Sequence, residues 1–436
     1  MNRSILLSSE TAARHKHTDL SFDVVIVGAG IAGCTAARLF ALEGLRVALV
    51  EHHAKADAYK QLCTHFIQPS ATPTIRRLGL DCLIEEAGAI RNSIDIWTRY
   101  GWIGNVSPVD KDGIELFGYN VQRRTLDPIL RRLAVTTPGV TSFPGCHVQR
   151  LVEQQGQVKR VELAGMDSAV LETRLLVGAD GRNSPLATLA GIRAVSTLNT
   201  RFGASAAYRG VRLVRGTCSQ MWMRGAEMGY IFPNDDGITV VAYMSTKDAF
   251  DEFHLSPRDS LTRAMASFPD APDLSTAIPE GRVLMVKDYP NLSGRPSARN
   301  IAFIGDALMS LDPLPGVGCG FAFQTAEWLV DALASALRDN RPLRGALNCY
   351  ARTVSRKLYG HRFFVRDMAR RRKFNVLDRL AFAAAAQDDW ASRHLHNFAA
   401  RLNGPGQFLA PQAVLRMLWI RLSRPASSSA QRDAPV

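Results

Sequence analysis

The residues with the clearest chemical potential are three glycines and one glutamate near the start of the chain. Gly28, Gly30 and Gly33 stand in the motif Gly-Ala-Gly-Ile-Ala-Gly, and Glu51 follows 23 residues after the first glycine. Glycines at this spacing allow a tight turn and a close approach of the backbone to a pyrophosphate, which then faces a helix N-terminus. A carboxylate at this offset can accept hydrogen bonds from ribose hydroxyls and would repel a 2′-phosphate. The motif therefore predicts a bound FAD- or NAD-like dinucleotide and disfavours NADP.

The segments around this motif have the patterns needed to position it. Residues 22–27 form a short, nearly continuous apolar run, which is typical of a strand buried on both faces of a parallel sheet. Residues 31–42 are rich in Ala and Leu and predict a helix, and residues 46–51 predict the next strand. A later helix is expected over residues 125–134, with Thr125 as its N-cap and a proline in its first turn.

Two further motifs follow strand-like runs. One is Gly-Ala-Asp-Gly, which contains Asp180 and Gly181, and the other is Gly-Asp-Ala, which contains Asp306. Asp306 can hydrogen-bond a sugar hydroxyl. Beyond it come an Asp-Pro pair that ends at Pro313 and a glycine-rich stretch, residues 316–320, that opens a helix. The N–H groups of such a helix start can stabilise negative charge on a reduced ring.

Together, the three motifs resemble those of the FAD-dependent monooxygenase superfamily typified by para-hydroxybenzoate hydroxylase. They occur in the same order and at comparable separations, over residues 22–337. The resemblance implies FAD, bound non-covalently because no His or Cys lies in a known attachment pattern. It also implies NADH or NADPH as the electron donor, acting directly or through a separate flavin reductase. The residues that the resemblance assigns to the cofactor are Gly28, Gly30, Ala32, Gly33, Glu51, Arg123, Asp180, Gly181, Asp306, Pro313, Gly316, Gly318 and Cys319.

The resemblance gives each part of this set a role. The glycine motif would hold the pyrophosphate, and Glu51 would bind the adenosine ribose. Asp306 would bind the ribityl chain or the neighbouring phosphate. Gly318 and Cys319 would present backbone N–H groups to the pyrimidine edge of the flavin, while Pro313 would lie against the isoalloxazine face.

Two assignments involve an arginine and the Asp-Gly pair. Arg123 begins an Arg-x-x-Leu-x-x-x-Leu pattern, which in this family places an arginine beside FAD, and Arg124 next to it is the alternative. Asp180 and Gly181 are linked in the family both to FAD and to the reduced pyridine nucleotide. The chain has no second dinucleotide fingerprint, so a separate NADPH domain is not expected.

The chain departs from the phenol hydroxylases at two places. Residues 60–65 contain no arginine where those enzymes carry one, and Met309 stands where they often have a histidine. The segment 305–323 looks closer to a bacterial branch of flavin oxidoreductases. The catalytic side chains stay unassigned, with His65 as one candidate for proton transfer.

The implied function is insertion of oxygen from O2 into a small, electron-rich organic substrate, in secondary or aromatic metabolism. The substrate is expected between an inserted sheet and the flavin, near Trp222, Tyr230 and Phe232, although these aromatics could equally be core. One alternative is a flavin-dependent reductase or dehydrogenase of isoprenoid-type substrates. A second is a flavin-dependent halogenase, which the absence of a Trp-x-Trp-x-Ile-Pro motif disfavours. A third is a redox-sensing flavoprotein that has lost turnover.

Composition narrows the class of protein. The 436 residues are 46% hydrophobic and 21% charged, which excludes extended disorder and collagen-like or repeat architectures. No run approaches ~18 apolar residues, so no membrane-spanning helix is expected. The seven scattered cysteines include no Cys-x-x-Cys pair. They predict reduced thiols, a cytoplasmic protein, and neither a disulfide framework nor a metal site.

The net charge of +13 is concentrated in residues 356–379. No nucleic-acid module surrounds this basic segment, so nucleic acid is not an expected partner. Two apolar stripes lie farther on: residues 374–382, and a second one formed by Leu415, Leu418, Trp419 and Leu422. We expect both stripes to pack on the FAD-binding domain rather than lie in a membrane interface.

The predicted fold class is α/β, with a Rossmann-like FAD-binding domain, an inserted antiparallel β-sheet substrate domain and a helical C-terminal region. The expected division is a flexible tail, a first FAD-binding part, a β-rich substrate domain, a returning FAD-binding segment, the helical region and a disordered tail. Their predicted bounds are 1–20, 21–194, 195–298, 299–340, 341–424 and 425–436, respectively.

Overall fold

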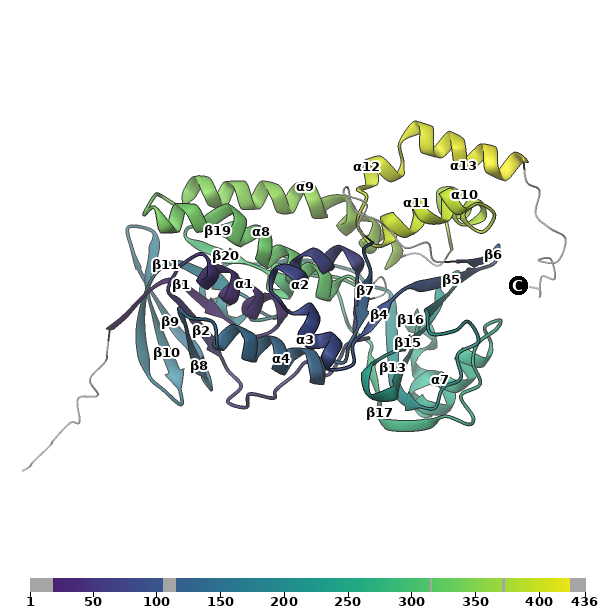
Figure 1. The fold of residues 1–436 in the computed structure, drawn as a ribbon, viewed down its shortest axis with the longest axis horizontal. Coiled ribbons are helices and arrows are strands. Elements are labelled where there is room, and N and C mark those ends of the chain that lie inside the picture. The colour runs from purple at the N-terminus through teal and green to yellow at the C-terminus, as the bar shows by residue number, and fades with distance from the viewer. Residues whose placement is uncertain (1–18, 105–114, 314–315, 371–372, 424–436) are drawn as a thin grey trace, which may run out of the picture.

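The computed structural model describes residues 19–104, 115–313, 316–370 and 373–423. The predicted tails therefore lie outside the described residues, apart from residues 19 and 20. Two large sheets lie toward opposite ends of the molecule, with helix α9 along the first and helices α10 to α13 over the second (Figure 1). The predicted α/β fold class is confirmed.

The first sheet carries the glycine motif. Its main path has the strand order β19-β20-β11-β1-β2-β8, and β10 and β9 extend it beside β11. The five strands from β20 to β8 are mutually parallel, whereas β19, β10 and β9 pair antiparallel. Their bounds are β1 Asp19–Val27, β2 Val47–Glu51, β8 Val140–Pro144, β9 Cys146–Gln154, β10 Gln157–Gly165, β11 Ala169–Gly178, β19 Ser297–Ala298 and β20 Ile301–Phe303.

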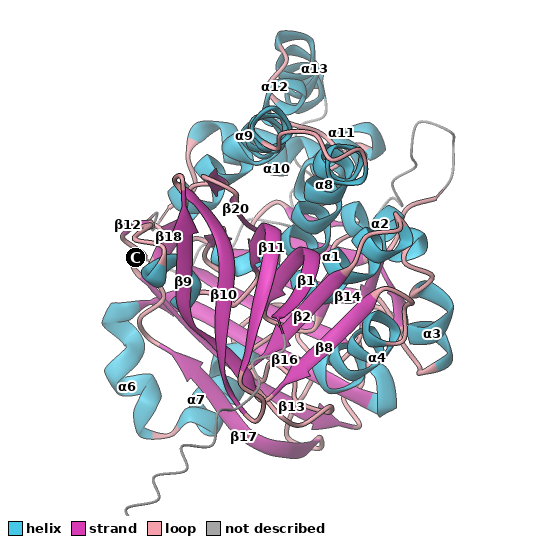
Figure 2. Cartoon of the chain, turned by 90° about the vertical axis from the view of Figure 1, so that its left-hand side faces the viewer, coloured by secondary structure: helices cyan, strands magenta, loops and turns pink. Residues whose placement is uncertain are grey.

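Helices cover this sheet because its central strands are apolar on both faces. All five residues of β2 are buried, and β1 is buried from Val24 to Val27. Figure 2 shows the helices around the fan of strands. The covering helices are α1 Ile31–Leu42, α4 Arg123–Val135, α8 Gly318–Arg338 and α9 Arg344–Met368.

Helix α4 begins earlier than predicted. Its N-cap is Gln122, so Thr125 is inside the helix, where its hydroxyl donates to Asp235 instead of capping. Pro128 also lies beyond the first turn, inside the helix. The prediction of Thr125 as the cap was wrong because that hydroxyl has a tertiary partner 110 residues away.

The second sheet has the strand order β17-β13-β16-β15-β14-β5-β6, and all its pairs are antiparallel except β14 with β5. Strands β5 and β6 come from the range expected for the first FAD-binding part, so this sheet is assembled from both sides of the predicted boundary. The bounds are β5 Ile94–Thr98, β6 Gly101–Ile103, β13 Arg201–Arg209, β14 Ser219–Arg224, β15 Glu227–Pro233, β16 Ile238–Thr246 and β17 Ile278–Val286.

Shorter elements connect the two sheets. Two three-stranded sheets have the orders β12-β18-β21 and β3-β7-β4. These strands are β3 Phe66–Ile67, β4 Ile90–Asn92, β7 Gly118–Asn120, β12 Val195–Thr197, β18 Asn291–Ser293 and β21 Met309–Ser310. The shorter helices are α2 Thr72–Arg77, α3 Asp81–Glu86, α5 Pro185–Leu189, α6 Phe250–Leu255 and α7 Pro257–Ala266, and the 3-10 turns are Pro69–Ala71, Asp235–Gly237, Lys247–Ala249 and Gly305–Ala307.

The last helices pack on the second sheet rather than on the nucleotide-binding sheet. Ala381, Phe382 and Leu395 share an apolar core with Tyr230 and Phe232 of the second sheet. This differs from the predicted packing on the FAD-binding domain, although α9 packs on α8 and the end of α11 hydrogen-bonds to Gln68. The four helices are α10 Val376–Ala385, α11 Asp389–Ala399, α12 Pro405–Phe408 and α13 Pro411–Ser423.

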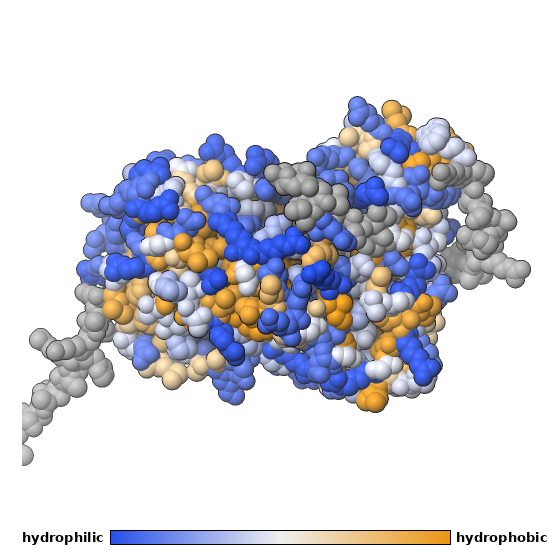
Figure 3. All heavy atoms as spheres, in the orientation of Figure 1, coloured by the Kyte–Doolittle hydropathy of each residue, from blue (hydrophilic) through white to orange (hydrophobic). Residues whose placement is uncertain are grey.

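Helix α13 packs through a face other than the predicted one. Ala413, Met417 and Ile420 are buried, whereas Leu415 and Trp419 are 65% and 64% exposed. The prediction that the second stripe packs inward was therefore wrong. In Figure 3 the lobe that carries α12 and α13 shows hydrophobic side chains among hydrophilic ones. Within the described ranges, no helix is long and apolar enough to cross a membrane.

Candidate functional site

A cavity of about 490 Å³ opens where the parallel strands of the first sheet end, and we call it the cofactor cavity. Polar loops at the carboxyl ends of parallel strands are the usual ligand site of such sheets. Every predicted site residue except Gly33 lines it: Gly28, Gly30, Ala32, Glu51, Arg123, Asp180, Gly181, Asp306, Pro313, Gly316, Gly318 and Cys319.

The glycines of the first motif serve two different purposes. A Cβ on Gly33 would collide with the carbonyl oxygen of Gly28, and Gly28 itself has a φ of +103°. These two positions let α1 begin tightly against β1. A Cβ on Gly30 would meet nothing within 4 Å, although Gly30 lines the cavity. The backbone at Gly30 is therefore bare toward the space that a pyrophosphate would fill.

Glu51 is held rigidly at the end of β2. One carboxylate oxygen accepts from the backbone N–H of Ala29 at 2.7 Å, and the other accepts from that of His53 at 2.9 Å. The side chain is buried but lines the cavity beside His52 and His53, which are exposed. A carboxylate oxygen of Glu51 and one ring nitrogen from each of the two histidines lie within 4.8 Å of one another. The arrangement ties the carboxylate to the glycine turn, where it would face the ribose.

Asp306 meets a lysine that was not singled out in the sequence. The Nζ of Lys60 lies 2.8 Å from its carboxylate, and both residues line the cavity. Asp306 stands in the 3-10 turn after β20, whereas Lys60 lies in the loop after β2. The pair therefore joins two ends of the site that are 246 residues apart, across the space predicted for the ribityl chain.

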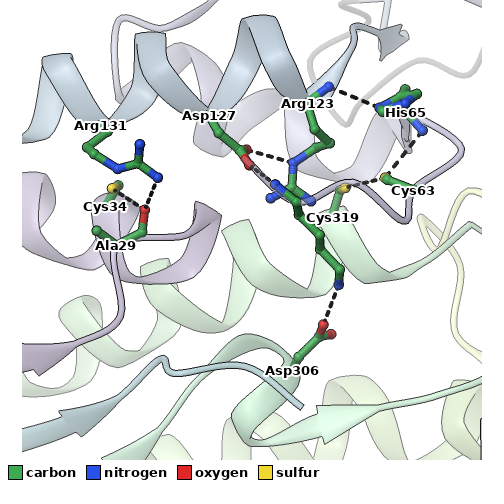
Figure 4. Close-up of polar contacts among 10 residues, drawn as sticks. Ala29, Cys34, Cys63, His65, Arg123, Asp127, Arg131, Asp306 and Cys319 are labelled. Atoms are coloured by element: carbon green, nitrogen blue, oxygen red, sulfur yellow. Dashed lines mark hydrogen bonds and ion pairs between the residues drawn. The ribbon is translucent and has the colours of Figure 1, made fainter. Parts of the chain in front are cut away.

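The arginine that lines the cavity is Arg123 and not Arg124. Arg123 is buried, and its Nε donates to Asp127 at 2.6 Å, one helical turn away (Figure 4). Arg124 points instead to Asp236 on the surface. The backbone N–H of Arg123 donates to Nδ1 of His65 at 3.0 Å. His65 thus satisfies an open N–H at the start of α4 and is not among the cavity-lining residues, which argues against a role in proton transfer.

The Asp-Gly motif is organised around the carboxylate of Asp180. It accepts from the Ser184 hydroxyl at 2.7 Å and from the Leu186 backbone N–H at 2.8 Å. Burial raises the pKa of Asp180, and these hydrogen bonds offset part of that rise. The carboxylate fixes the start of α5. At the cavity, the motif contributes the turn at Gly181, which has a φ of +82° and no side chain to fill the space.

The first turn of α8 closes the cavity at the end predicted for the flavin ring. A Cβ on Gly318 would meet nothing within 4 Å, and one on Gly316 would lie 2.6 Å from the ring of Phe66. Asp312 is buried and accepts from the side-chain amide of Asn199 at 2.6 Å, which anchors the loop that carries Pro313. Bare helix N–H groups at this place suit an anionic ring edge.

A second cavity of about 230 Å³ adjoins the first, and we call it the apolar chamber. It lies between the second sheet and the C-terminal helices. Tyr230 and Phe232 line it as predicted, but Trp222 does not: it is fully buried on the other side of the sheet against Phe268. Six residues line both cavities: Thr64, Phe66, Met244, Pro313, Gly316 and Val317.

Several site residues escaped the sequence analysis. Lys60 and Cys63 lie in a loop without a recognisable motif, and their partners are far along the chain. Arg401 follows α11 and reaches the chamber. Asp127 could have been found, because an acid four residues after Arg123 on a helix is the expected ion-pair spacing.

The residues present fit FAD. The cavity offers Glu51 at one end, backbone without side chains at Gly30, Asp306 in the middle and the α8 N-terminus at the other end. This donor and acceptor sequence matches a ribose, a pyrophosphate, a polyol and a ring edge in turn. When bound, FAD supplies the redox chemistry. The chain would orient it, and the adjoining chamber is lined mainly by apolar side chains.

Comparison with known proteins agrees with this fit. A family model described as FAD binding domain matches residues 21–353, and the chain belongs to this family. It is an FAD-dependent oxidoreductase of the monooxygenase superfamily that the motifs indicated. Among the relatives is the 3-demethoxyubiquinol 3-hydroxylase of Escherichia coli (strain K12), which is 22% identical over 73% of this chain and 81% of its own length.

One further relative and one solved structure are similar to the chain. The probable electron transfer flavoprotein-quinone oxidoreductase YdiS of Escherichia coli (strain K12) is 25% identical over 61% of this chain, and the match spans 64% of its own length, less than two thirds. A flavoprotein/dehydrogenase from Cytophaga hutchinsonii shares the fold with a TM-score of 0.79 at 17% identity, covering 92% of this chain and 99% of that one.

Proposed function

We propose that this protein is an FAD-dependent monooxygenase that inserts one oxygen atom from O2 into an electron-rich organic substrate held in the apolar chamber. The observation that carries the proposal is the wall that the two cavities share at the end predicted for the flavin ring. The six shared residues include Phe66, whose ring stacks on Phe232 with centroids 5.3 Å apart. A substrate in the chamber would lie next to the end of the cofactor cavity predicted for the ring.

The chamber suits oxygen transfer because it is lined mainly by apolar and aromatic side chains. Water in such a site would divert the oxygen to free peroxide, so a dry pocket favours transfer to substrate. The electrons would come from NADH or NADPH, directly or through a separate flavin reductase.

The charges around the chamber favour a substrate with an acidic group. Arg201, Lys373 and Arg401 line it, whereas Asp378 is the one acid among the described lining residues. The Asp378 carboxylate accepts from the Asn375 backbone N–H, which caps α10.

Arg401 is the cation best placed to bind that group. Its guanidinium donates to Gln324 at 2.7 Å and to the Ser70 hydroxyl at 2.9 Å, and it stacks on Phe321. No carboxylate within the described ranges forms an ion pair with it. An aromatic or otherwise apolar acid would supply that charge.

A reductase acting on apolar, isoprenoid-type or quinone-type substrates is the second candidate. The same chamber favours it, and so does the relative that is a probable quinone oxidoreductase. The two reactions differ in the fate of O2, because only the monooxygenase places an oxygen atom in the product.

Turnover under isotopically labelled O2 tests the proposal. Aromatic acids and their methyl esters are offered to the holoenzyme with NADH or NADPH, and the products are analysed by mass spectrometry. We expect one labelled oxygen atom per product molecule and a preference for the acids. A reduced product without label, or no product from any member of the panel, would refute the proposal.

A matched pair of variants tests whether the chamber is the substrate site. Met223→Trp places a bulky indole ring in the chamber, whereas Met285→Trp places one on the same sheet away from it. We expect Met223→Trp to lose substrate-dependent turnover while both variants retain FAD. Equal turnover in the two variants would place the substrate elsewhere.

A further inference from the structure

Two cysteines face each other inside the cofactor cavity. The Sγ atoms of Cys63 and Cys319 lie 4.0 Å apart, although the residues are 256 positions apart in sequence (Figure 4). Cys63 lies in the loop before β3, and Cys319 is the second residue of α8. Both line the cavity, so a small molecule in the cavity can reach them.

The surroundings of the pair favour a thiolate on Cys63. Its Sγ accepts from the backbone N–H of His65 at 3.3 Å. The hydrogen bond with Cys319 holds the pKa of the Cys63 thiol well below its ordinary value, and His65 and the cationic Arg123 act in the same direction. The same hydrogen bond and burial raise the pKa of Cys319. Cys63 is thus favoured as the thiolate nucleophile, and Cys319 is favoured as the protonated thiol.

The other five cysteines lack this arrangement. Cys34 is buried, donates to the Ala29 carbonyl, and has its pKa raised to about 12 by burial. Cys146 is also buried, Cys218 hydrogen-bonds Ser93, and Cys82 and Cys349 are exposed and single. Thiolate character and access decide which thiols are oxidised. Cys34 is therefore an internal reference for a thiol that should stay inert.

We propose that Cys63 and Cys319 form a peroxide-reactive pair that closes into a disulfide beside the flavin site. The Cys63 thiolate attacks hydrogen peroxide, the O–O bond breaks, and Cys63 becomes a sulfenic acid as hydroxide leaves and takes up a proton. The Cys319 sulfur then attacks the Cys63 sulfur, the S–O bond breaks, and water leaves with the thiol proton. In sum, two thiols and one peroxide give one disulfide and two waters.

The geometry allows this closure with a small movement. A disulfide needs its sulfurs at about 2 Å, so they must approach by roughly 2 Å. Cys319 belongs to α8, which is packed into the core, whereas residues 52–62 ahead of Cys63 are mostly exposed. The loop is the more exposed of the two sides, and it also carries Lys60, the partner of Asp306. Closure would therefore alter the cofactor cavity as well as the thiols.

The proposal does not depend on which reaction the flavin performs. Hydrogen peroxide arises whenever a reduced flavin meets O2 without passing an oxygen atom to a substrate, and it would arise inside this cavity. The disulfide would then form in response to peroxide released by such unproductive turnover in the same cavity. A monooxygenase and a reductase exposed to air would both meet this oxidant.

Mapping of the thiols tests the pair directly. The FAD-loaded Cys82→Ser/Cys349→Ser protein, which lacks the two exposed thiols, is titrated with hydrogen peroxide and alkylated, and its peptides are identified by mass spectrometry. We expect the Cys63 and Cys319 peptides to become cross-linked, with two thiols lost per peroxide and both regained with dithiothreitol. Cys34 should lose its thiol at least about tenfold more slowly.

Single variants separate the two roles. With Cys319→Ser, oxidation should stop at a sulfenic acid on Cys63 that dimedone captures, and with Cys63→Ser the Cys319 thiol should persist. The peptide map of the Cys82→Ser/Cys349→Ser protein serves as the readout if either variant fails to fold. Overoxidation of Cys63 while Cys319 remains free, or equal rates at Cys34 and Cys63, would overturn the proposal.

Discussion

The cofactor cavity and the apolar chamber share six lining residues, yet the chain builds them in different ways. The cofactor cavity is built around the glycine motif and the loops at the ends of β1, β2, β11 and β20, with further residues from α4, α8 and the second sheet. The chamber is made of side chains from the second sheet and from helices near the end of the chain. At the glycine motif, cofactor binding would require that side chains be absent, whereas the shape of the chamber is set by bulky side chains.

Because of this contrast, we expect the two sites to differ in how well they tolerate amino-acid substitutions. A nucleotide would approach the backbone at Gly28–Gly33, where an added methyl group either has no room or would meet the ligand. In the chamber, many apolar residues of similar volume could fill the same wall, because cores tolerate volume-conserving exchanges. The first site should be sensitive to single atoms, and the second to larger changes in volume or charge.

The largest effect is expected at the glycine turn. Gly33→Val forces a side chain into the carbonyl oxygen of Gly28, so we expect loss of FAD together with a large loss of folding stability. Gly30→Ala adds a methyl group in open space at a φ of −81°, which alanine adopts freely. This variant should fold normally and bind FAD more weakly.

Circular dichroism and flavin fluorescence distinguish the two glycine variants. If Gly30→Ala binds FAD as the wild type does, the bare backbone at Gly30 does not face the pyrophosphate. If Gly33→Val retains FAD, the close contact between α1 and β1 is not required, and the contrast between the two sites fails at its strongest point.

A smaller effect is expected at Asp306. Its replacement by Ala would remove the charge-assisted hydrogen bond predicted between this carboxylate and the cofactor, worth roughly 1.5–3 kcal/mol, so FAD affinity should fall about tenfold to a hundredfold. Asp306→Asn keeps the size and one acceptor and should lose less. Titration of the apoprotein with FAD measures both. An unchanged dissociation constant in Asp306→Ala would remove this residue from the cofactor site.

The same contrast accounts for what the sequence could predict. Gly28, Gly30, Glu51 and Asp306 were recognisable because backbone approach and ribose binding demand particular residue types at particular spacings. The strands and helix around them follow from local apolar patterns. These residues come together in one cavity as expected.

The rest depends on tertiary contacts that leave no local signal. Nothing near Lys60 or Cys63 indicates a partner more than 240 residues away. The exposed stripe of α13 shows the same limit, since the pattern marks apolar positions but does not say which of them the second sheet covers. Arg401 lines the chamber only because the chain folds back after α11.

The smallest effect that we predict is a loss of folding stability at acidic pH, caused by His361 in the wall of the chamber. His361 on α9 is buried, lines the chamber and stacks on Phe398 with ring centroids 5.3 Å apart. Burial lowers its pKa to about 4, and the nearby Arg401 acts in the same direction, opposed by a hydrogen bond with the backbone of Asn403. The folded protein therefore keeps His361 neutral at pH values where the unfolded chain, with an ordinary pKa near 6.5, already binds a proton.

Stability that depends on His361 is thus fully present above pH about 6.5 and is lost as the pH falls toward 4. At pH 5 the loss should amount to about 1–2 kcal/mol. His361→Phe keeps the stacking but cannot titrate, so its unfolding free energy should fall less between pH 7 and pH 5 than that of the wild type. Denaturant unfolding at the two pH values measures this difference, with His147→Gln on the exposed side of β9 as the matched control. An identical pH dependence in wild type and His361→Phe would mean that the titration of His361 does not contribute to the loss of folding stability in acid.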